Sequence, residues 1–487
     1  SGEPGPQKGS KGAIEFHVLA PFTQAHEQLV PLVVAHQKAG SILIVAPDEK
    51  DVDLVIASLR NANLSPLKLT AALTREERYR NYLLAMHGAN SIVVGTRSAI
   101  FAPIKNLATV IVHKESSLDH YEIRSPGWNT RTVALLRSEF QSLKLILTGF
   151  SPSIEVSQLI DERKVKYLNS KENVNVKAFT PSEGALLPGR IFEDIKKALA
   201  IGPVLFIAPR KGYGNALLCA HCRNVATCDC GGRLSVSAKA KAPSCVHCGK
   251  AFQEWKCSFC NRDKQYLAGR GIERAAEEIS RAFPNFPVVI SAGDVIKDRI
   301  DPKPSLVLAT AGAQPQVEGG YAAVVILDGM RFFAHTDLRT QERARELFLE
   351  TASLISPKGF ALLVIDDSHP IVSAISRWNI APLLKRELSE RSELYLPPSV
   401  FSVVLVMDQA IGVQIANGLK KSALEGRIPQ SSRIYGPTEI SKDEVKIVIH
   451  VDKKDAPALT NTVYELQRRR SIAKKELFTL RVEPYSL

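Results

Sequence analysis

The sequence lacks cysteine almost everywhere. All eight cysteines of the 487 residues lie between Cys219 and Cys260. No signal peptide is recognisable and no cysteine lies elsewhere, which argues against a secreted protein held by disulfides. No stretch approaches the roughly 18 uninterrupted apolar residues that cross a bilayer. We therefore expect no membrane span, and the cytosol is the expected compartment.

The composition is that of an ordinary globular chain with an excess of positive charge. Hydrophobic residues make up 45% of the chain, enough for sizeable cores, and the length suggests about three domains. Lys and Arg number 63 against 50 Asp and Glu, a net charge of +13. This balance favours a polyanionic partner such as nucleic acid, and a merely solvated basic surface is the alternative.

The cysteines fall in closely spaced pairs, which are Cys219 with Cys222, Cys228 with Cys230, Cys245 with Cys248, and Cys257 with Cys260. A C-x-x-C turn brings two thiolates to one metal ion, and four thiolates complete the tetrahedral shell of a structural zinc ion. The segment has almost no apolar core of its own, so metal would supply its folding energy. Eight cysteines therefore predict two zinc ions per chain, with the C-x-C pair as the weakest.

Short apolar runs alternate with amphipathic segments over most of the chain. In the first part, the runs typical of buried parallel strands are 41–47, 91–96, 108–113 and 144–149. A helix is predicted at 51–61. The pattern indicates a doubly wound α/β lobe that would bind a ligand at the carboxyl ends of its strands. Runs at 203–208, 305–310 and 322–328 predict a second lobe, into which the cysteine segment is inserted.

The chain is expected to comprise a linker, a first α/β lobe, a second α/β lobe, a double-zinc insertion and a small α+β C-terminal domain. The predicted boundaries are, in that order, 1–12, 13–160, 161–218 with 265–380, 219–264, and 381–487. The opening is rich in Gly, Pro and Lys, which is typical of a linker. We expect the chain to be a fragment whose preceding region is absent.

Two groups of basic residues are candidate DNA contacts. The first flanks the cysteines and comprises Arg210, Lys211 and Arg262. The second lies at the end of the predicted helix 456–470 and comprises Arg468, Arg469, Arg470, Lys474 and Lys475. Such runs are more often solvated faces than binding sites. Aromatic residues near the cysteines, including Trp255 and Phe259, could stack on bases or pack beneath the zinc loops.

Several local motifs resemble the PriA family of bacterial replication-restart helicases. Residues 94–107 are similar to its GTRSALFxPxxNL segment, and 210–222 resemble its RRGY…LLCxxCG segment. Glu387-Leu-x-x-Arg391 followed by Pro397-Pro398 resembles its ELxxR…PP start of the C-terminal domain. The resemblance runs from about Ile14 to Leu487. It implies two RecA-like helicase lobes, a two-zinc insertion in the second lobe, and a small C-terminal domain.

The resemblance also implies a zinc pairing that spacing alone leaves open. In the family the outer pairs hold one ion, which carries over to Cys219, Cys222, Cys257 and Cys260. The inner pairs hold the other, which carries over to Cys228, Cys230, Cys245 and Cys248. The implied partners are forked or single-stranded DNA, primosome or helicase-loading proteins, and single-strand-binding protein.

The chain departs from the family at each motif of ATP hydrolysis. Residues 18–26, where a phosphate-binding loop should lie, contain neither glycine nor lysine. The DEEH motif, whose carboxylates hold Mg²⁺, is replaced by His113-Lys-Glu-Ser116. Residues 347–359, where the arginines of QVAGRAGR should lie, contain no arginine. This degenerate pattern is similar to the actinobacterial branch of the family, which lacks helicase motifs.

The leading functional hypothesis is a non-catalytic replication-restart protein of the primosome. It would bind branched or single-stranded DNA at stalled forks and help to load the replicative helicase. The alternatives are a residual DNA-dependent ATPase or 3′-5′ helicase with an altered nucleotide pocket, and a protein-interaction module that has lost DNA binding.

Overall fold

The structure is a computed structural model. It describes residues 12–181, 185–209, 217–222, 224–230, 233–236, 242–245, 249–267, 272–334 and 337–487. The chain divides into two compact units. The first unit comprises Ser1–Val18, His26–Leu168 and Leu384–Leu487, and the second comprises Leu19–Ala25 and Asn169–Leu383.

The first unit contains a seven-stranded sheet, here called the first sheet, with the strand order β3-β4-β2-β5-β8-β1-β9. Every pairing in it is parallel. Its strands are β1 (Ile14–Val18), β2 (Ser41–Val45), β3 (Leu67–Leu69), β4 (Ile92–Gly95), β5 (Leu107–Val112), β8 (Lys144–Gly149) and β9 (Lys166–Leu168). The predicted strands of this region are all present, and they confirm the α/β class.

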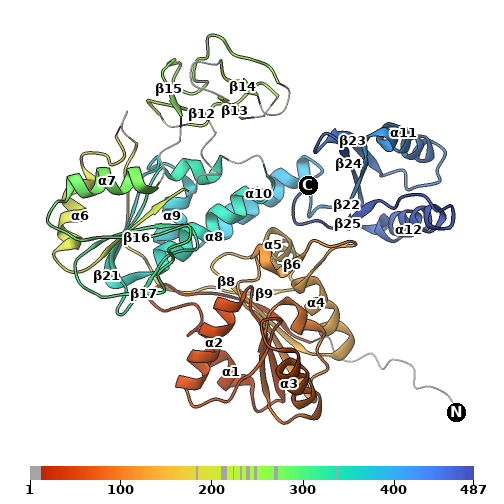
Figure 1. Ribbon diagram of the computed structural model, residues 1–487, viewed down its shortest axis with the longest axis horizontal. Helices are drawn as coiled ribbons and strands as arrows, with labels where there is room; N and C mark the ends of the chain where they lie inside the picture. The colour runs from red at the N-terminus through yellow and green to blue at the C-terminus, as the bar shows by residue number, and fades with distance from the viewer. Residues whose placement is uncertain are drawn as a thin grey trace. The chain divides into compact units, whose positions relative to one another are not determined.

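Helices cover both faces of the first sheet (Figure 1). Helices α1 (Leu29–His36) and α2 (Glu49–Asn61) pack on one face, where Ile42 and Ile44 of β2 are fully buried. Helices α3 (Arg75–His87), α4 (Thr130–Gln141) and α5 (Ile154–Asp161) pack on the other, against Leu43 and Val45. Alternate residues of one apolar run therefore serve two cores, which is why the strands read as continuous Val, Ile and Leu.

The second unit contains a six-stranded sheet, here called the second sheet, with the order β10-β21-β20-β11-β18-β16 and only parallel pairings. Its strands are β10 (Val176–Ala178), β11 (Val204–Ala208), β16 (Val288–Ser291), β18 (Leu306–Thr310), β20 (Tyr321–Ile326) and β21 (Ile355–Leu363). Helices α6 (Ile191–Leu199) and α7 (Ile272–Ala282) share one apolar core with it. The cysteine segment lies between β11 and α7 in the chain.

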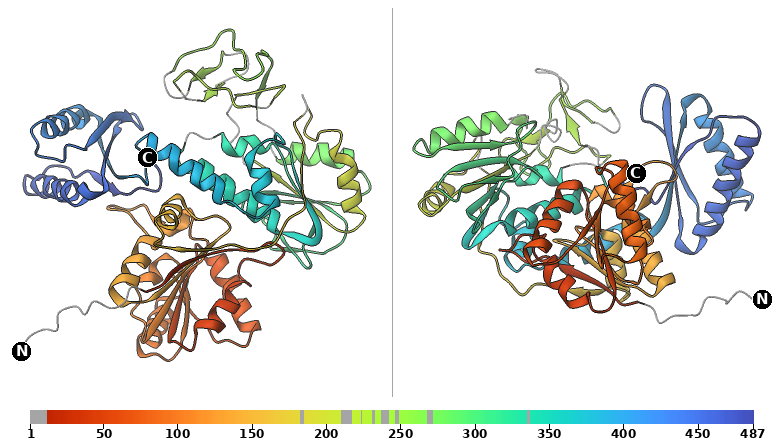
Figure 2. Two further views of the ribbon diagram at one scale, coloured as in Figure 1. Left: turned by 180° about the vertical axis from the view of Figure 1, so that it is seen from behind. Right: turned by 60° about the horizontal axis from the view of Figure 1, so that its bottom comes forward.

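The last part of the first unit forms an antiparallel sheet with the order β23-β24-β22-β25. Its elements are β22 (Val400–Asp408), α11 (Gln409–Leu424), β23 (Arg433–Glu439), β24 (Glu444–Asp452), α12 (Ala456–Ile472) and β25 (Thr479–Val482). Both helices pack on one face of this sheet, as Figure 2 shows. Helix α10 (Ala381–Glu393) precedes it, and there Arg391 pairs with Glu387 at 2.7 Å.

No helix in the described ranges is both long enough and apolar enough to cross a bilayer.

Candidate functional site

Four cysteines from two separate turns form the first candidate metal centre. The Sγ atoms of Cys219, Cys222, Cys257 and Cys260 all lie within 4.8 Å of one another. The Sγ atoms of Cys219 and Cys260 are 3.4 Å apart, and those of Cys222 and Cys257 are 3.6 Å apart. Zinc–sulfur bonds of about 2.3 Å in a tetrahedron separate the sulfurs by about 3.8 Å. The four thiols, none of which forms a disulfide, therefore fit one zinc ion.

The backbone brings these two turns together. Strands β12 (Leu217–Cys219) and β15 (Gln265–Leu267) pair antiparallel, so the chain enters and leaves the cysteine segment side by side. The second turn closes through a hydrogen bond of 2.8 Å from the Cys257 N–H to the Arg262 carbonyl. Cysteines 35 and 41 residues apart in the chain thereby reach one point.

The surroundings of these thiols affect their protonation differently. Burial raises the pKa of Cys219, Cys222 and Cys257. The backbone N–H of Arg262 lowers the pKa of Cys260 to about 7. Because a metal ion binds thiolates, its binding would displace protons from the first three thiols.

Cysteines of the inner pairs form a second group. The Sγ atoms of Cys228, Cys230 and Cys245 lie within 4.8 Å of one another, and those of Cys230 and Cys245 are 3.5 Å apart. Cys228 and Cys245 are buried, whereas Cys230 is exposed. Cys245 lies in β14 (Ser244–Cys245), which pairs with β13 (Leu234–Ser235). The fourth predicted ligand, Cys248, lies outside the described residues.

The predicted DNA contacts near the cysteines are only partly described. Arg210 and Lys211 lie outside the described residues, whereas Arg262 is exposed in the turn after Cys260. Trp255 is only 5% exposed and belongs to the small core of the cysteine segment. Phe259 is 68% exposed. Of these two aromatic side chains, only Phe259 offers a face for a base.

Two arginines of the second basic group are already engaged within the chain. Arg468 pairs with Glu465 at 2.9 Å. The Arg470 guanidinium lies 4.2 Å from the centre of the Phe478 ring, and its Nε donates to a backbone carbonyl at 2.7 Å. Both contacts hold the end of α12, where cations also offset the helix dipole.

The other three members of this group project from the same end of α12. Arg469, Lys474 and Lys475 are exposed. None of them has an ion pair within the described part of the chain. These three are therefore the side chains of the second basic group that could bind phosphate without breaking a contact.

At the carboxyl edge of the first sheet, the residue after His113 carries a positive charge. Lys114 follows β5, and its Nζ lies 3.1 Å from Oδ1 of Asp51 in the first turn of α2. Burial would raise the pKa of Asp51, but the Lys114 ammonium holds it below its ordinary value. A lysine ammonium thus neutralises the acidic group on the neighbouring element.

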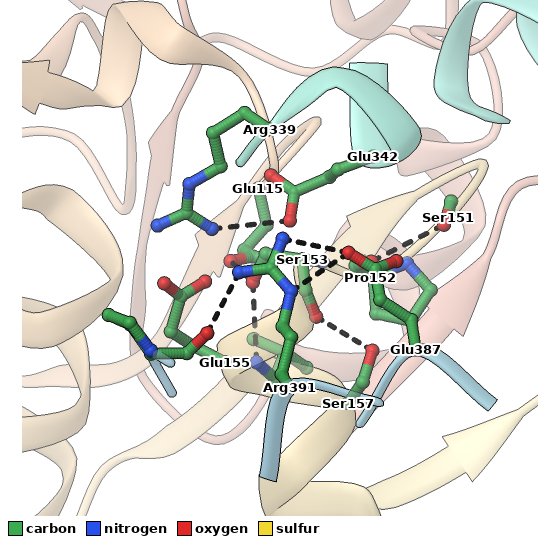
Figure 3. Close-up of polar contacts among 12 residues, drawn as sticks. Glu115, Ser151, Pro152, Ser153, Glu155, Ser157, Arg339, Glu342, Glu387 and Arg391 are labelled. Atoms are coloured by element: carbon green, nitrogen blue, oxygen red, sulfur yellow. Dashed lines mark hydrogen bonds and ion pairs between the residues drawn. The ribbon is translucent and has the colours of Figure 1, made fainter. Parts of the chain in front are cut away.

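Glu115 is the one carboxylate of the DEEH position that the chain retains, and it is fully buried. Its Oε1 lies 2.6 Å from Arg131 Nη1 and accepts the Ser153 hydroxyl at 2.7 Å. Its Oε2 accepts the Ser153 N–H at 3.1 Å. Ser153 is also the N-cap of α5, and Figure 3 shows Glu115 beside it. Both carboxylate oxygens therefore already have partners from the chain.

His113 occupies the position of the first DEEH acid and is buried. Its Nδ1 lies 3.0 Å from the Thr148 hydroxyl of β8, and its carbonyl accepts His120 Nε2 at 2.8 Å. Burial lowers the pKa of His113 to about 3 and that of His120 to about 4. Both imidazoles are neutral at physiological pH and belong to the core.

The segment after β1 forms no phosphate cradle. Residues 19–25 belong to the second unit, where the Trp378 indole N–H donates to the Leu19 carbonyl at 2.8 Å. The Phe22 N–H donates to the Ser353 carbonyl at 3.1 Å. A phosphate needs free backbone N–H groups at a helix start. Here the first N–H groups of α1 already bond to the carbonyls of the preceding turn.

The chain matches curated bacterial proteins over most of its length. It is 33% identical over 433 residues to the protein named "Probable replication restart protein PriA" in Mycobacterium tuberculosis. That match covers 83% of this chain and 65% of the relative. The chain is a homologue of the PriA replication restart proteins. It spans less than two thirds of the length of the mycobacterial relatives.

A more distant relative matches a larger share of both chains. The "Replication restart protein PriA" of Rickettsia felis is 24% identical over 486 residues, which cover 91% of this chain and 72% of the relative. No protein-family model matches the chain. The resemblance to PriA that the motifs carry is thus confirmed by the curated relatives, including those of the mycobacterial branch.

Solved structures resemble the chain only weakly. RecG bound to a three-way DNA junction is 10% identical with a TM-score of 0.41, over 77% of this chain and 43% of that chain. The E. coli DExH-box NTPase HrpB is 13% identical with a TM-score of 0.38, over 74% of this chain and 40% of that chain. TM-scores this low carry no argument about function.

Cysteine substitutions should remove metal from one centre at a time. We expect the purified chain to contain two zinc ions, Cys257→Ser to retain about one, and Cys245→Ser to retain about one, because three thiolates bind zinc far more weakly than four. Elemental analysis per mole of protein measures this. Ser258→Ala, in the same turn as Cys257 but not a thiol, should keep both ions. Full zinc content in Cys257→Ser would contradict the assignment.

The two buried imidazoles should make the folded chain less stable as the pH falls below about 6.5. They stay neutral when folded but take up protons below about pH 6.5 when unfolded. The unfolded chain therefore binds more protons between about pH 6.5 and 4, and each imidazole costs up to ~1.4 kcal/mol per pH unit there. Hydrogen-exchange protection of β5 and β8, corrected for intrinsic rates, should show this fall.

His113→Asn should flatten this pH dependence by the share of one imidazole. His87→Asn, which changes an exposed histidine of α3, should leave it unchanged. An equal pH slope in His113→Asn and the wild type would contradict a neutral buried His113.

Proposed function

We propose that this chain acts in replication restart as a DNA-binding scaffold. It binds branched or single-stranded DNA at stalled forks and helps to load the replicative helicase, without ATP-driven unwinding. Homology to the PriA proteins supports the restart role. The proposal that the chain does not unwind DNA rests on one observation. At the carboxyl edge of the first sheet, the side chains that would bind a nucleotide contact other residues of the chain instead.

The internal contacts of this edge oppose phosphoryl transfer. The reaction needs a lysine and backbone N–H groups on the phosphates, carboxylates on Mg²⁺, and an arginine on the γ-phosphate. Here Lys114 pairs with Asp51, and Glu115 is held by Arg131 and Ser153. An arginine finger alone is worth about 10³ to 10⁵ in rate. A sheet edge whose lysine and carboxylate are engaged with other side chains in this way would retain the scaffold of a motor and not its chemistry.

In this proposal the two parallel sheets are degenerate helicase lobes. They occupy residues 13–160 and 161–218 with 265–380, and they position the zinc insertion (219–264) and the C-terminal domain (381–487). Zinc ions in the two cysteine groups supply structural cross-links to a segment with a very small core. The insertion and the C-terminal domain then present rigid surfaces to DNA.

DNA binding rests on phosphate contacts. Arg469, Lys474 and Lys475 lie together at the end of α12 and are exposed. Each phosphate that such a side chain neutralises releases a counterion, so affinity falls with salt. The net charge of +13 adds attraction over a longer range. Helicase-loading proteins and single-strand-binding protein are the protein partners that the homology suggests.

Neutralising the exposed residues at the end of α12 should weaken fork binding and its salt dependence. We expect Arg469→Ala, Lys474→Ala and Lys475→Ala together to lower the slope of log K against log salt by up to about 0.9 per contact on duplex DNA. Fluorescence anisotropy with a labelled fork across a salt series measures both quantities.

The matched control removes the same charge elsewhere. Arg60→Ala, Arg75→Ala and Arg78→Ala together neutralise exposed arginines of α2 and α3, and should leave the slope nearly unchanged. An equal loss in both triple variants would mean that net charge, and not the end of α12, governs binding. No measurable fork binding by the wild type would contradict the scaffold and favour a protein-interaction module.

A further inference from the structure

A pocket lies at the amino end of the first sheet, away from the edge described above. Its volume is about 490 Å³, and Arg137, Lys105, Met86, Ile104 and Leu143 are among its lining residues. The lining also includes Leu107, where β5 begins, whereas His113 follows the end of β5. A six-residue strand spans about 20 Å. The pocket, which is a shallow depression open to solvent, and the closed edge are therefore separate places.

Arg137 brings a half-buried positive charge to this pocket, and it forms no ion pair with a carboxylate of the described residues. Its Nη1 donates to the Ile100 carbonyl at 2.6 Å and is 3.4 Å from the Ala102 carbonyl. Its Nε donates to the Gln141 side-chain oxygen at 3.1 Å. All three acceptors are neutral, and burial lowers the pKa of the guanidinium. A partly buried cation whose acceptors are all neutral has no anion to balance its charge. An anionic ligand would supply one.

One face of this guanidinium remains available. The Nη2 group makes no hydrogen bond within the described part of the chain, and it is not among the buried polar atoms that lack a partner. It is therefore accessible to solvent, and Arg137 is among the residues that line the pocket. Holding the end of the 3-10 helix η1 (Arg97–Phe101) through Ile100 needs only Nη1. The contact of Nη1 with the end of η1 thus leaves the N–H groups of Nη2 available as hydrogen-bond donors.

The rest of the pocket combines apolar surface with a second cation. Leu143 and Ile104 are 4% and 7% exposed and form its apolar base, and Met86 is 37% exposed. Lys105 is exposed at the same pocket and has no ion pair in the described ranges. Its ammonium adds to the positive potential without a fixed geometry. The combination suits an anionic group joined to an apolar body.

We propose that this pocket binds a small organic carboxylate. The carboxylate accepts hydrogen bonds from Arg137 Nη2, and its apolar body lies against Met86, Ile104 and Leu143. A hydrogen bond from a charged guanidinium to a carboxylate is roughly twice as strong as one between neutral groups, so Nη2 favours a carboxylate over a neutral acceptor. This site is independent of DNA binding and of the closed edge of the first sheet.

The test uses 4-phenylbutyrate as probe, with 4-phenylbutanamide as its neutral counterpart and inorganic phosphate as an anion without an apolar body. Isothermal titration on the whole chain should show saturable binding of 4-phenylbutyrate at least about tenfold tighter than that of the amide or of phosphate, since only the carboxylate has both features. Arg137→Gln should weaken 4-phenylbutyrate binding at least about tenfold and leave amide binding unchanged.

The control Arg80→Gln removes the same charge from an exposed position of α3, and should bind 4-phenylbutyrate like the wild type. The comparison of carboxylate with amide on the wild type does not depend on how any variant folds. Equal binding of amide and carboxylate, equal binding of phosphate, unchanged binding by Arg137→Gln, or no saturable binding of 4-phenylbutyrate would each overturn the proposal.

Discussion

The contacts of the Glu115 carboxylate determine what the first sheet can do. This group is fully buried, and its two oxygens bind Arg131 and both donors of Ser153. Removing one partner of such a buried pair typically costs about 3 to 5 kcal/mol, because the other charge stays behind in a dry environment. Glu115 could bind a magnesium ion or a catalytic water only after losing contacts with Arg131 or Ser153, at a free-energy cost of this size. The same edge also carries Lys114 paired with Asp51.

We expect the cysteine segment to depend on metal binding more than on apolar burial for its stability. Its apolar core is small, with Leu217, Leu234 and Trp255 as its large buried side chains among the described residues, and its turns converge on two groups of thiols. Metal would connect these turns where apolar burial cannot. Its two ends pair as β12 and β15, so the segment begins and ends on one short two-stranded stem. In the proposed function, the parallel sheets carry the parts of the chain that bind DNA.

Local sequence patterns predicted the helices and strands, but they did not predict contacts between residues far apart in the chain. Apolar runs such as 41–47 identified the strands because burial on both faces leaves a continuous signal in the sequence. The loss of the phosphate-binding loop was readable because glycine and lysine are absent from 18–26. The Trp378 contact with Leu19 was not readable, since its partners lie 359 residues apart. Arg131 gave no local signal either, and Arg470 proved to be engaged with Phe478.

ATP binding and turnover by the purified, zinc-loaded chain test the central claim most directly. Equilibrium titration with ATP and Mg²⁺, followed by phosphate release with and without forked DNA, would be measured beside Glu115→Gln. The account predicts no saturable ATP binding and no turnover above background under either condition, while the fork still binds. DNA-stimulated turnover that Glu115→Gln abolishes would contradict it, because Glu115 would then serve a working nucleotide site and not only the core.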